Sequence, residues 1–180
     1  MANALYPKFK EQALQGGVNL SSGNIKAVLV DLADYTYSAA HEFLSDVAAG
    51  GRVATSGNLA SKTFTGGVFD SADPSFTAVT GDVSEALILY IDTGTPSTSR
   101  LVGFYDTGVT GLPVTPNGGD INITVNASGW FAAKPPICAW FVMDETVETV
   151  ETVPIVELVS VATRKRPPTS GLRNSRTDAR

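Results

Sequence analysis

One stretch of the sequence, Ser84 to Gly108, constrains the fold more than any other. It contains two apolar runs, SEALILYID and RLVGFYDTG, which flank a turn rich in Gly, Pro, Ser and Thr. Alternating apolar runs on either side of such a turn are typical of an antiparallel β-hairpin. In this hairpin Leu87, Leu89 and Ile91 line one face, and on the return strand Leu101, Gly103 and Tyr105 alternate with Val102 and Phe104. The stretch therefore predicts a long hairpin at the centre of an all-β core.

Further strands are predicted on both sides of the hairpin. Residues 25–32 (IKAVLVDL) are almost continuously apolar, which favours a strand that is covered on both faces. Residues 120–126 (DINITVN) alternate between apolar and polar side chains, as a half-buried strand does. Shorter candidates, separated by Gly-, Asn- and Pro-containing turns, are residues 52–56, 61–65, 67–70 and 75–80. Short strands at this spacing are typical of sandwiches and barrels.

Two short helices are predicted. Residues 4–15 have helical apolar spacing and end at Gly16 and Gly17, and Pro7 fits only within the first turn. A second helix is expected over residues 39–47, with Ser38 as its N-cap. The predicted fold class is thus mainly β, an antiparallel sandwich or jelly-roll-like barrel with a short N-terminal helix. That helix is expected to cover an open edge or end of the sheet.

The charge of the chain is distributed unevenly. Residues 164–180 contain six basic residues and one acidic residue, a net charge of +5, whereas residues 1–163 contain 7 basic and 17 acidic residues, a net charge of −10. We expect a β-domain over residues 1–131 and an extended C-terminal arm over residues 132–180, which includes three ETV repeats and an apolar strand at residues 155–161. The basic end is either a solvated tail or an arm that docks on an acidic partner or on nucleic acid. Its candidate partner-binding residues are Arg164, Lys165, Arg166, Arg173, Arg176 and Arg180.

The sequence shows no signal peptide and no apolar run of membrane-spanning length. The N-terminus becomes charged at once and has no apolar signal region. The apolar runs are much shorter than the ~20 residues that a membrane span needs. With Cys138 as the single cysteine, an intrachain disulfide is excluded. These features predict a soluble protein that is made in the cytoplasm.

The strongest chemical motif is Asp-Thr-Gly, which occurs at Asp92 and again at Asp106. Aspartic proteases use this tripeptide twice, so that two aspartates share one proton. Here the two aspartates fall at different ends of the predicted hairpin, so we interpret both as turn residues. His41, the single histidine, and Cys138 have no sequence motif of a nucleophilic or zinc site around them. The prediction is a protein that is not an enzyme and has no cofactor and no metal.

The aromatic residues bear on two kinds of binding site. They are not interleaved with basic residues, so a base-stacking platform for nucleic acid is not indicated. A sugar-binding face remains as an alternative, built on Tyr35, Tyr37, Trp130 and Trp140.

Three groups of segments carry a resemblance to a known class of proteins. They are LYPKFKE (5–11) with residues 25–31; DYTYS (34–38) with His41 and FLSDV (43–47); and GLPVTPNGGD (111–120). Over residues 3–131 the chain resembles small tailed-bacteriophage proteins that are encoded among the virion structural genes. The similar proteins end soon after the segment that matches Trp130 and Phe131, so the resemblance does not extend to the C-terminal arm.

The resemblance implies a role in the virion. A capsid decoration (cement) protein and a tail accessory protein both fit it. The first hypothesis is a homo-oligomeric decoration protein on the phage head, whose partners are the major capsid protein and copies of itself. The alternative is a tail or host-surface module that binds a glycan or another receptor. Neither hypothesis involves a membrane, and nucleic acid is expected as a partner only through the basic tail.

Overall fold

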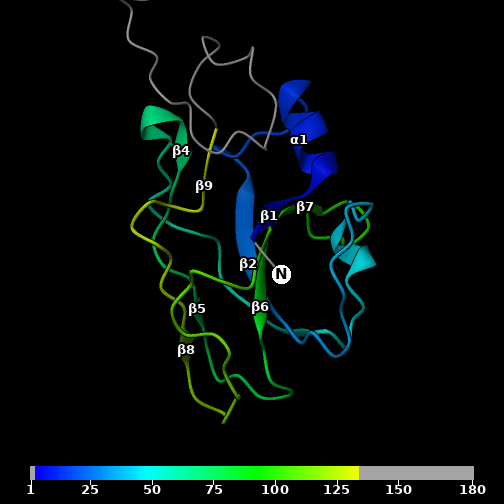
Figure 1. The fold of residues 1–180 in the computed structure, drawn as a ribbon, viewed down its shortest axis with the longest axis vertical. Helices are drawn as coiled ribbons and strands as arrows, with labels where there is room; N and C mark the ends of the chain where they lie inside the picture. Colours follow the sequence, from blue (N-terminus) through cyan, green and yellow to red (C-terminus); the bar gives the residue numbers. More distant parts are fainter. Residues whose placement is uncertain (1–2, 134–180) are drawn as a thin grey trace, which may run out of the picture. The chain divides into compact units, whose positions relative to one another are not determined.

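The computed structural model describes residues 3–133, and at their centre is a five-stranded antiparallel sheet (Figure 1). The order of its strands is β1-β7-β6-β2-β3, so β1 and β3 are the edges. Their bounds are β1 Ala4–Leu5, β2 Asn24–Val30, β3 Arg52–Thr55, β6 Ala86–Asp92 and β7 Arg100–Tyr105. The mainly β, antiparallel fold class is therefore confirmed.

The predicted central hairpin is β6 and β7, and it occupies the middle of the sheet. Both strands carry apolar side chains on both faces, so both faces can be covered by other parts of the domain. Residues Ala86 to Tyr90 and Leu101 to Tyr105 are buried throughout. The register contains a bulge: Leu89 lies opposite Gly103, but Tyr90 lies opposite Leu101, which leaves Val102 as an extra residue. Strict alternation predicted that Leu101 shares a face with Gly103 and Tyr105. Because of the bulge, it does not.

Two small sheets form a second layer. One pairs β4 (Val68–Phe69) with β9 (Phe131–Ala132), and the other pairs β5 (Ser75–Phe76) with β8 (Ile121–Asn122). In Figure 1 they lie on one side of the central sheet, while the segment between β2 and β3 lies on the other. The alternation of buried and exposed side chains predicted for DINITVN is correct. Only two of its residues, Ile121 and Asn122, pair with β5. The layered arrangement thus describes the domain, with the second layer divided between two short sheets.

Strand β7 contacts a different layer through each face. Phe104 packs against Tyr35 and Tyr37, with ring centroids 6.4 and 5.5 Å away. The next residue, Tyr105, packs edge-on against Trp130 at 5.3 Å. Successive side chains of a strand point to opposite faces. Phe104 therefore contacts the segment after β2 on one face of the sheet, and Tyr105 contacts the segment before β9 on the other.

The N-terminal helix is confirmed, but it is shorter than predicted. Helix α1 spans Pro7–Leu14, with Pro7 at the first helical position, and Ala4–Leu5 belong to the sheet instead. Phe9 is buried and contacts Phe131 at a centroid distance of 5.8 Å. Leu14, the last residue of the helix, is instead 89% exposed. The helix therefore packs on the domain through Phe9.

The second predicted helix, residues 39–47, is wrong. Only a short 3-10 helix, η1 (Leu44–Asp46), forms there, and Phe43 before it is extended and bridges to Arg100 of β7. The Asp46 carboxylate accepts hydrogen bonds from the backbone N–H groups of Glu42 (2.7 Å) and Phe43 (3.0 Å). In a continuous helix these N–H groups would instead donate to backbone carbonyls of the preceding turn. Another 3-10 helix, η2 (Thr65–Gly67), includes Gly66 in the left-handed region at φ 64° and leads into β4.

Candidate interaction site

The two Asp-Thr-Gly motifs lie at opposite ends of the hairpin. Asp92 ends β6 beside the turn, where it pairs with Lys26 (2.7 Å) and accepts the N–H of Gly94 (3.0 Å). Asp106 follows β7 at the other end, and its N–H donates to Asn3 (3.1 Å). The hydrogen bond from Lys26 lowers the pKa of the Asp92 carboxyl. The two carboxylates therefore do not form a proton-sharing pair, in agreement with their interpretation as turn residues.

His41 belongs to a short chain of hydrogen bonds. Its Nδ1 lies 2.9 Å from the hydroxyl of Tyr35, which in turn lies 2.8 Å from the hydroxyl of Tyr6. Burial raises the pKa of Tyr35 to about 12, and it raises the pKa of the more deeply buried Tyr6 further still. Both phenols thus stay protonated at neutral pH and tie the segment after β2 to the N-terminal segment. No helix contains His41, contrary to the sequence prediction.

The three described residues of the set proposed for a sugar-binding face do not form an exposed aromatic surface. Tyr35 and Trp130 are buried, at 4% and 5% exposure, while Tyr37 is half-buried against Phe104. A ring that stacks on a sugar or a base has to present its face to solvent. Trp140 and Cys138 lie outside the described residues, and so do the six basic candidates Arg164, Lys165, Arg166, Arg173, Arg176 and Arg180.

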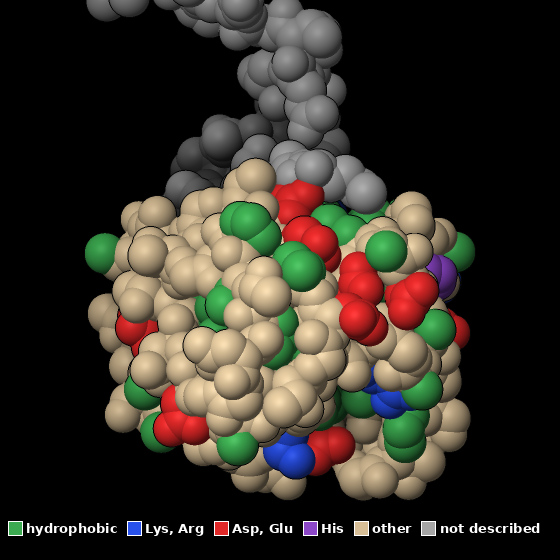
Figure 2. Space-filling model, turned by 90° about the horizontal axis from the view of Figure 1, so that it is seen from below, with side chains coloured by type: hydrophobic (Ala, Val, Ile, Leu, Met, Phe, Trp, Pro, Cys, Tyr) green, Lys and Arg blue, Asp and Glu red, His purple; other side chains and the backbone are tan. Residues whose placement is uncertain are grey.

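The described part of the chain is acidic. Residues 3–133 contain six Lys and Arg residues against twelve Asp and Glu residues, hence a net charge of −6. Figure 2 shows acidic side chains gathered on part of one face, where basic side chains are sparse. Two of the basic residues are already neutralised, because Lys26 pairs with Asp92 and Arg100 with Glu42 (2.8 Å). The domain therefore offers a surface that attracts cations.

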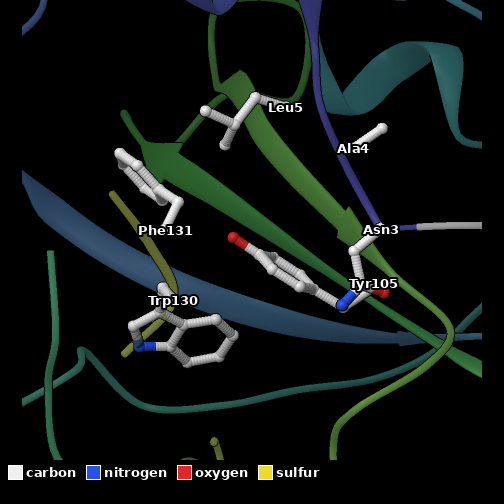
Figure 3. Close-up of a pocket in the computed structure, with 6 residues that line it drawn as sticks. All are labelled: Asn3, Ala4, Leu5, Tyr105, Trp130 and Phe131. Atoms are coloured by element: carbon white, nitrogen blue, oxygen red, sulfur yellow. The ribbon is translucent and has the colours of Figure 1, made fainter. Parts of the chain in front are cut away.

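A small cavity lies beside the first strand, and sequence reasoning did not find it (Figure 3). Its volume is about 110 Å³. Leu5, Tyr105 and Phe131 form much of its wall, and the hydroxyl of Tyr105 points into the space between the other two. The full lining is Asn3, Ala4, Leu5, Tyr105, Trp130 and Phe131. The cavity is thus mainly apolar, with one phenol group.

The conformation of Tyr105 depends on Gly103, two residues earlier on the same face. A Cβ atom at residue 103 would lie 2.7 Å from the Tyr105 hydroxyl oxygen and within 3.0 Å of its ring. The ring therefore lies across the glycine and brings its hydroxyl towards Leu5, which is opposite Gly103 in the register. The Gly-x-Tyr spacing was the one sequence signal of this arrangement.

The Tyr105 hydroxyl has no hydrogen-bond partner among the described residues. Tyr105 is only 5% exposed, and burial raises its pKa, so the group remains a neutral donor at physiological pH. Leaving a buried polar group without a partner costs about 1–3 kcal/mol. A buried phenol of this kind indicates a position where an external acceptor would be stabilising.

The edge of the sheet runs along the same cavity. Tyr6 donates its N–H to the carbonyl of Val102 (3.0 Å), which marks it as a hydrogen-bonded position of the β1–β7 ladder. Positions in an antiparallel ladder alternate between facing the partner and facing away, so the N–H and C=O of Leu5 are directed away from β7. Since β1 is an edge strand, these two groups are placed to pair with an added strand.

Another cavity, about 180 Å³ in volume, lies between the loops of residues 56–60 and 72–75. Its polar groups are occupied by the domain itself: Ser56 accepts the N–H of Ala27 (2.9 Å), and Asp73 accepts that of Val125 (2.9 Å). Within residues 3–133, no group of three His, Cys, Asp or Glu side chains is arranged to hold a metal ion. In the same residues no helix is long and apolar enough to cross a membrane.

Comparison with known proteins adds no assignment. No protein-family model matches the chain, and no curated protein is significantly similar to it. The resemblance to phage virion proteins therefore stays a prediction, as does the expectation that the protein is not an enzyme.

Proposed function

We propose that this protein is a non-enzymatic structural component of a tailed-phage virion, which binds the assembled head and stabilises it. The observation that carries the proposal is the opposition of charge along the chain. The described domain has a net charge of −6, and residues 164–180 have a net charge of +5. A chain with both signs is suited to lie across neighbouring subunits, with its basic end on acidic surface.

The proposed mechanism is passive binding. Several copies bury surface across the junctions of the shell, and because they bind only the assembled state, they stabilise it by mass action. Each tenfold excess of ligand over its dissociation constant adds about 1.4 kcal/mol of stabilisation per site. Such a role requires a rigid domain and an attachment segment, and it requires no catalytic residues.

The test is binding of the purified full chain to phage heads that lack it. The structure sets the truncation point, because Ala132 belongs to β9 and Ala133 donates its N–H to Gly67 (2.8 Å). Deleting residues 136–180 therefore leaves β9 intact, and we expect occupancy on heads to fall by at least about tenfold. A second variant, with the six basic residues replaced by Gln, should lose binding mainly at low salt, because salt screens charge attraction.

Labelled protein on intact virions decides between the head and the tail. Label over the head, with reduced rupture of the particle on heating, is the expected result. Label confined to the tail supports instead the tail accessory or receptor-binding hypothesis. Unchanged head occupancy of the chain truncated after residue 135 would contradict the proposed role of the C-terminal arm.

A further inference from the structure

Two features at the β1 edge could accommodate an added strand: the backbone groups of Leu5 and the hydroxyl of Tyr105. The backbone groups of Leu5 point away from β7, and the buried hydroxyl of Tyr105, in the wall of the adjoining cavity, has no hydrogen-bond partner among residues 3–133. An extended segment can supply partners for both, because its backbone pairs with the edge and one of its carbonyls accepts the hydrogen bond of the hydroxyl, while an aliphatic side chain fills the cavity. An apolar cavity of roughly 150 Å³ holds a benzene molecule, so about 110 Å³ has room for a single aliphatic side chain.

The chain itself contains a segment with the required chemistry, residues 155–161 (IVELVSV). It is rich in β-branched residues, contains no Gly or Pro, and carries Val159 and Leu158 on opposite faces when extended. Basic residues 164–166 follow after two further residues, and their charge is opposite to the acidic charge of the domain. These properties single it out among the residues after Ala133.

The segment is also long enough to reach another molecule. Twenty-one residues lie between Ala133 and Ile155, and a chain of that length extends to roughly 70 Å. The radius of gyration of a domain of this size is only about 14 Å. On a crowded shell, neighbouring copies present their β1 edges at high effective concentration.

We propose that residues 155–161 of one copy add a strand to the β1 edge of a second copy, place one aliphatic side chain in the cavity beside Tyr105, and accept the hydrogen bond of the Tyr105 hydroxyl with a backbone carbonyl. This inference rests on the proposed role of the C-terminal arm in joining neighbouring copies, and it names the surface that receives the arm. The interaction links copies head to tail, because the segment and the receiving edge are different surfaces.

The test measures self-association of the full chain by sedimentation velocity over a wide range of concentration, without phage particles. The wild-type chain should associate reversibly. Leu5→Trp fills the cavity, and Leu14→Trp makes the same change at an 89% exposed residue on α1 and serves as its control. We expect the first to weaken association at least about tenfold and the second to leave it unchanged.

Two further variants probe the same contact from each side. Tyr105→Phe keeps the ring and removes only the hydroxyl, so folding is preserved and association should weaken about three- to tenfold. Leu158→Asp and Val159→Asp place a charge on either face of the segment, and the one that enters the cavity should reduce association at least about tenfold.

Mixing the variants tests exchange between copies. Leu5→Trp retains an intact segment, and the Asp variant of the segment retains an intact cavity, so a mixture should form a heterodimer that neither variant forms alone. A wild-type chain that stays monomeric, or variants that associate as the wild type does, overturn the inference. Because no particle is present, such a result leaves head binding as a separate question, and a chain that self-associates but does not bind heads refutes only the proposed function.

Discussion

At the scale of single residues, Gly103 and Tyr105 show how a small side chain positions a large one. The Tyr105 ring occupies the space where a Cβ of residue 103 would lie, and its edge packs against Trp130. The absence of a side chain at Gly103 is thus what lets a tyrosine lie along its own strand. The sequence alone shows the spacing of the two residues but gives no reason for it.

Gly103→Ala is expected to destabilise the domain by about 1–3 kcal/mol, because the new methyl group forces the Tyr105 ring out of its packed position. Urea unfolding followed by tryptophan fluorescence measures the loss. The control is Gly57→Ala, where an added Cβ meets nothing within 4 Å, and where we expect a change within about 0.5 kcal/mol. Equal midpoints for the two variants would show that the ring moves aside without cost.

At the scale of elements, the sequence pattern located the long strands and also the short strands β3, β4 and β5, but it did not predict which segments the short strands pair with. β2, β6 and β7 were recognised because six or seven successive positions are apolar or alternate. In contrast, β4 pairs with β9 through Phe69 and Phe131, which lie far apart in the sequence. A two-residue strand carries no periodicity of its own, and its pairing depends on the rest of the fold.

The helix predicted over residues 39–47 failed for a related reason. Its apolar residues, including Leu44 and Val47, do point to the core, so the pattern was genuine. The backbone, however, is held by β7: Leu101 donates its N–H to Glu42 (2.9 Å), and Leu44 donates its own to Ser99 (2.8 Å). Tertiary hydrogen bonds outweigh a weak helical preference in a short segment. The cavity beside β1 was unpredictable on the same grounds, since three separate segments of the chain build it.

The Asp46 carboxylate is predicted to make this segment sensitive to acid. Although partial burial acts to raise its pKa, the N–H groups of Glu42 and Phe43 have the greater combined effect and lower it. A carboxyl whose pKa is lower in the folded protein than in the unfolded chain stabilises the fold. The stabilisation is complete at pH values above the pKa of the unfolded chain, which is about 4. That stabilisation is lost as the pH falls below this value and through the pKa of the folded state.

Asp46→Ala should therefore cost roughly 1 kcal/mol at pH 7 and progressively less below about pH 4. Urea midpoints measured at several pH values for the variant and the wild type give this difference. Asp82→Ala removes a carboxylate that makes no hydrogen bond or ion pair with another residue of the described part of the chain, and it serves as the control. A penalty for Asp46→Ala that stays constant down to pH 2 would contradict the role of the carboxylate.

At the scale of the whole molecule, the apolar core of the described domain is drawn from residues between Tyr6 and Trp130. It includes both faces of the central sheet and the buried side of α1. A chain truncated after Pro135 is therefore expected to fold alone, with a urea midpoint close to that of the full chain. Circular dichroism and a cooperative unfolding curve check this. A truncated chain without a cooperative transition would show that later residues complete the core.

The pairing of β1 with β7 has a consequence for how the chain acquires its fold. Ala4 lies opposite Phe104, so the first strand can pair only after the ribosome has synthesised about a hundred further residues. Until then the N-terminal segment cannot complete its edge of the sheet, because β7 has not yet been synthesised. Topologies closed by such distant contacts fold slowly, in about milliseconds to seconds, because the entropy of closing a long loop is lost before any contact compensates for it. During synthesis the earliest residues to emerge are thus among the last to become protected, which leaves Leu5 and Phe9 accessible to chaperones for most of the time that translation takes.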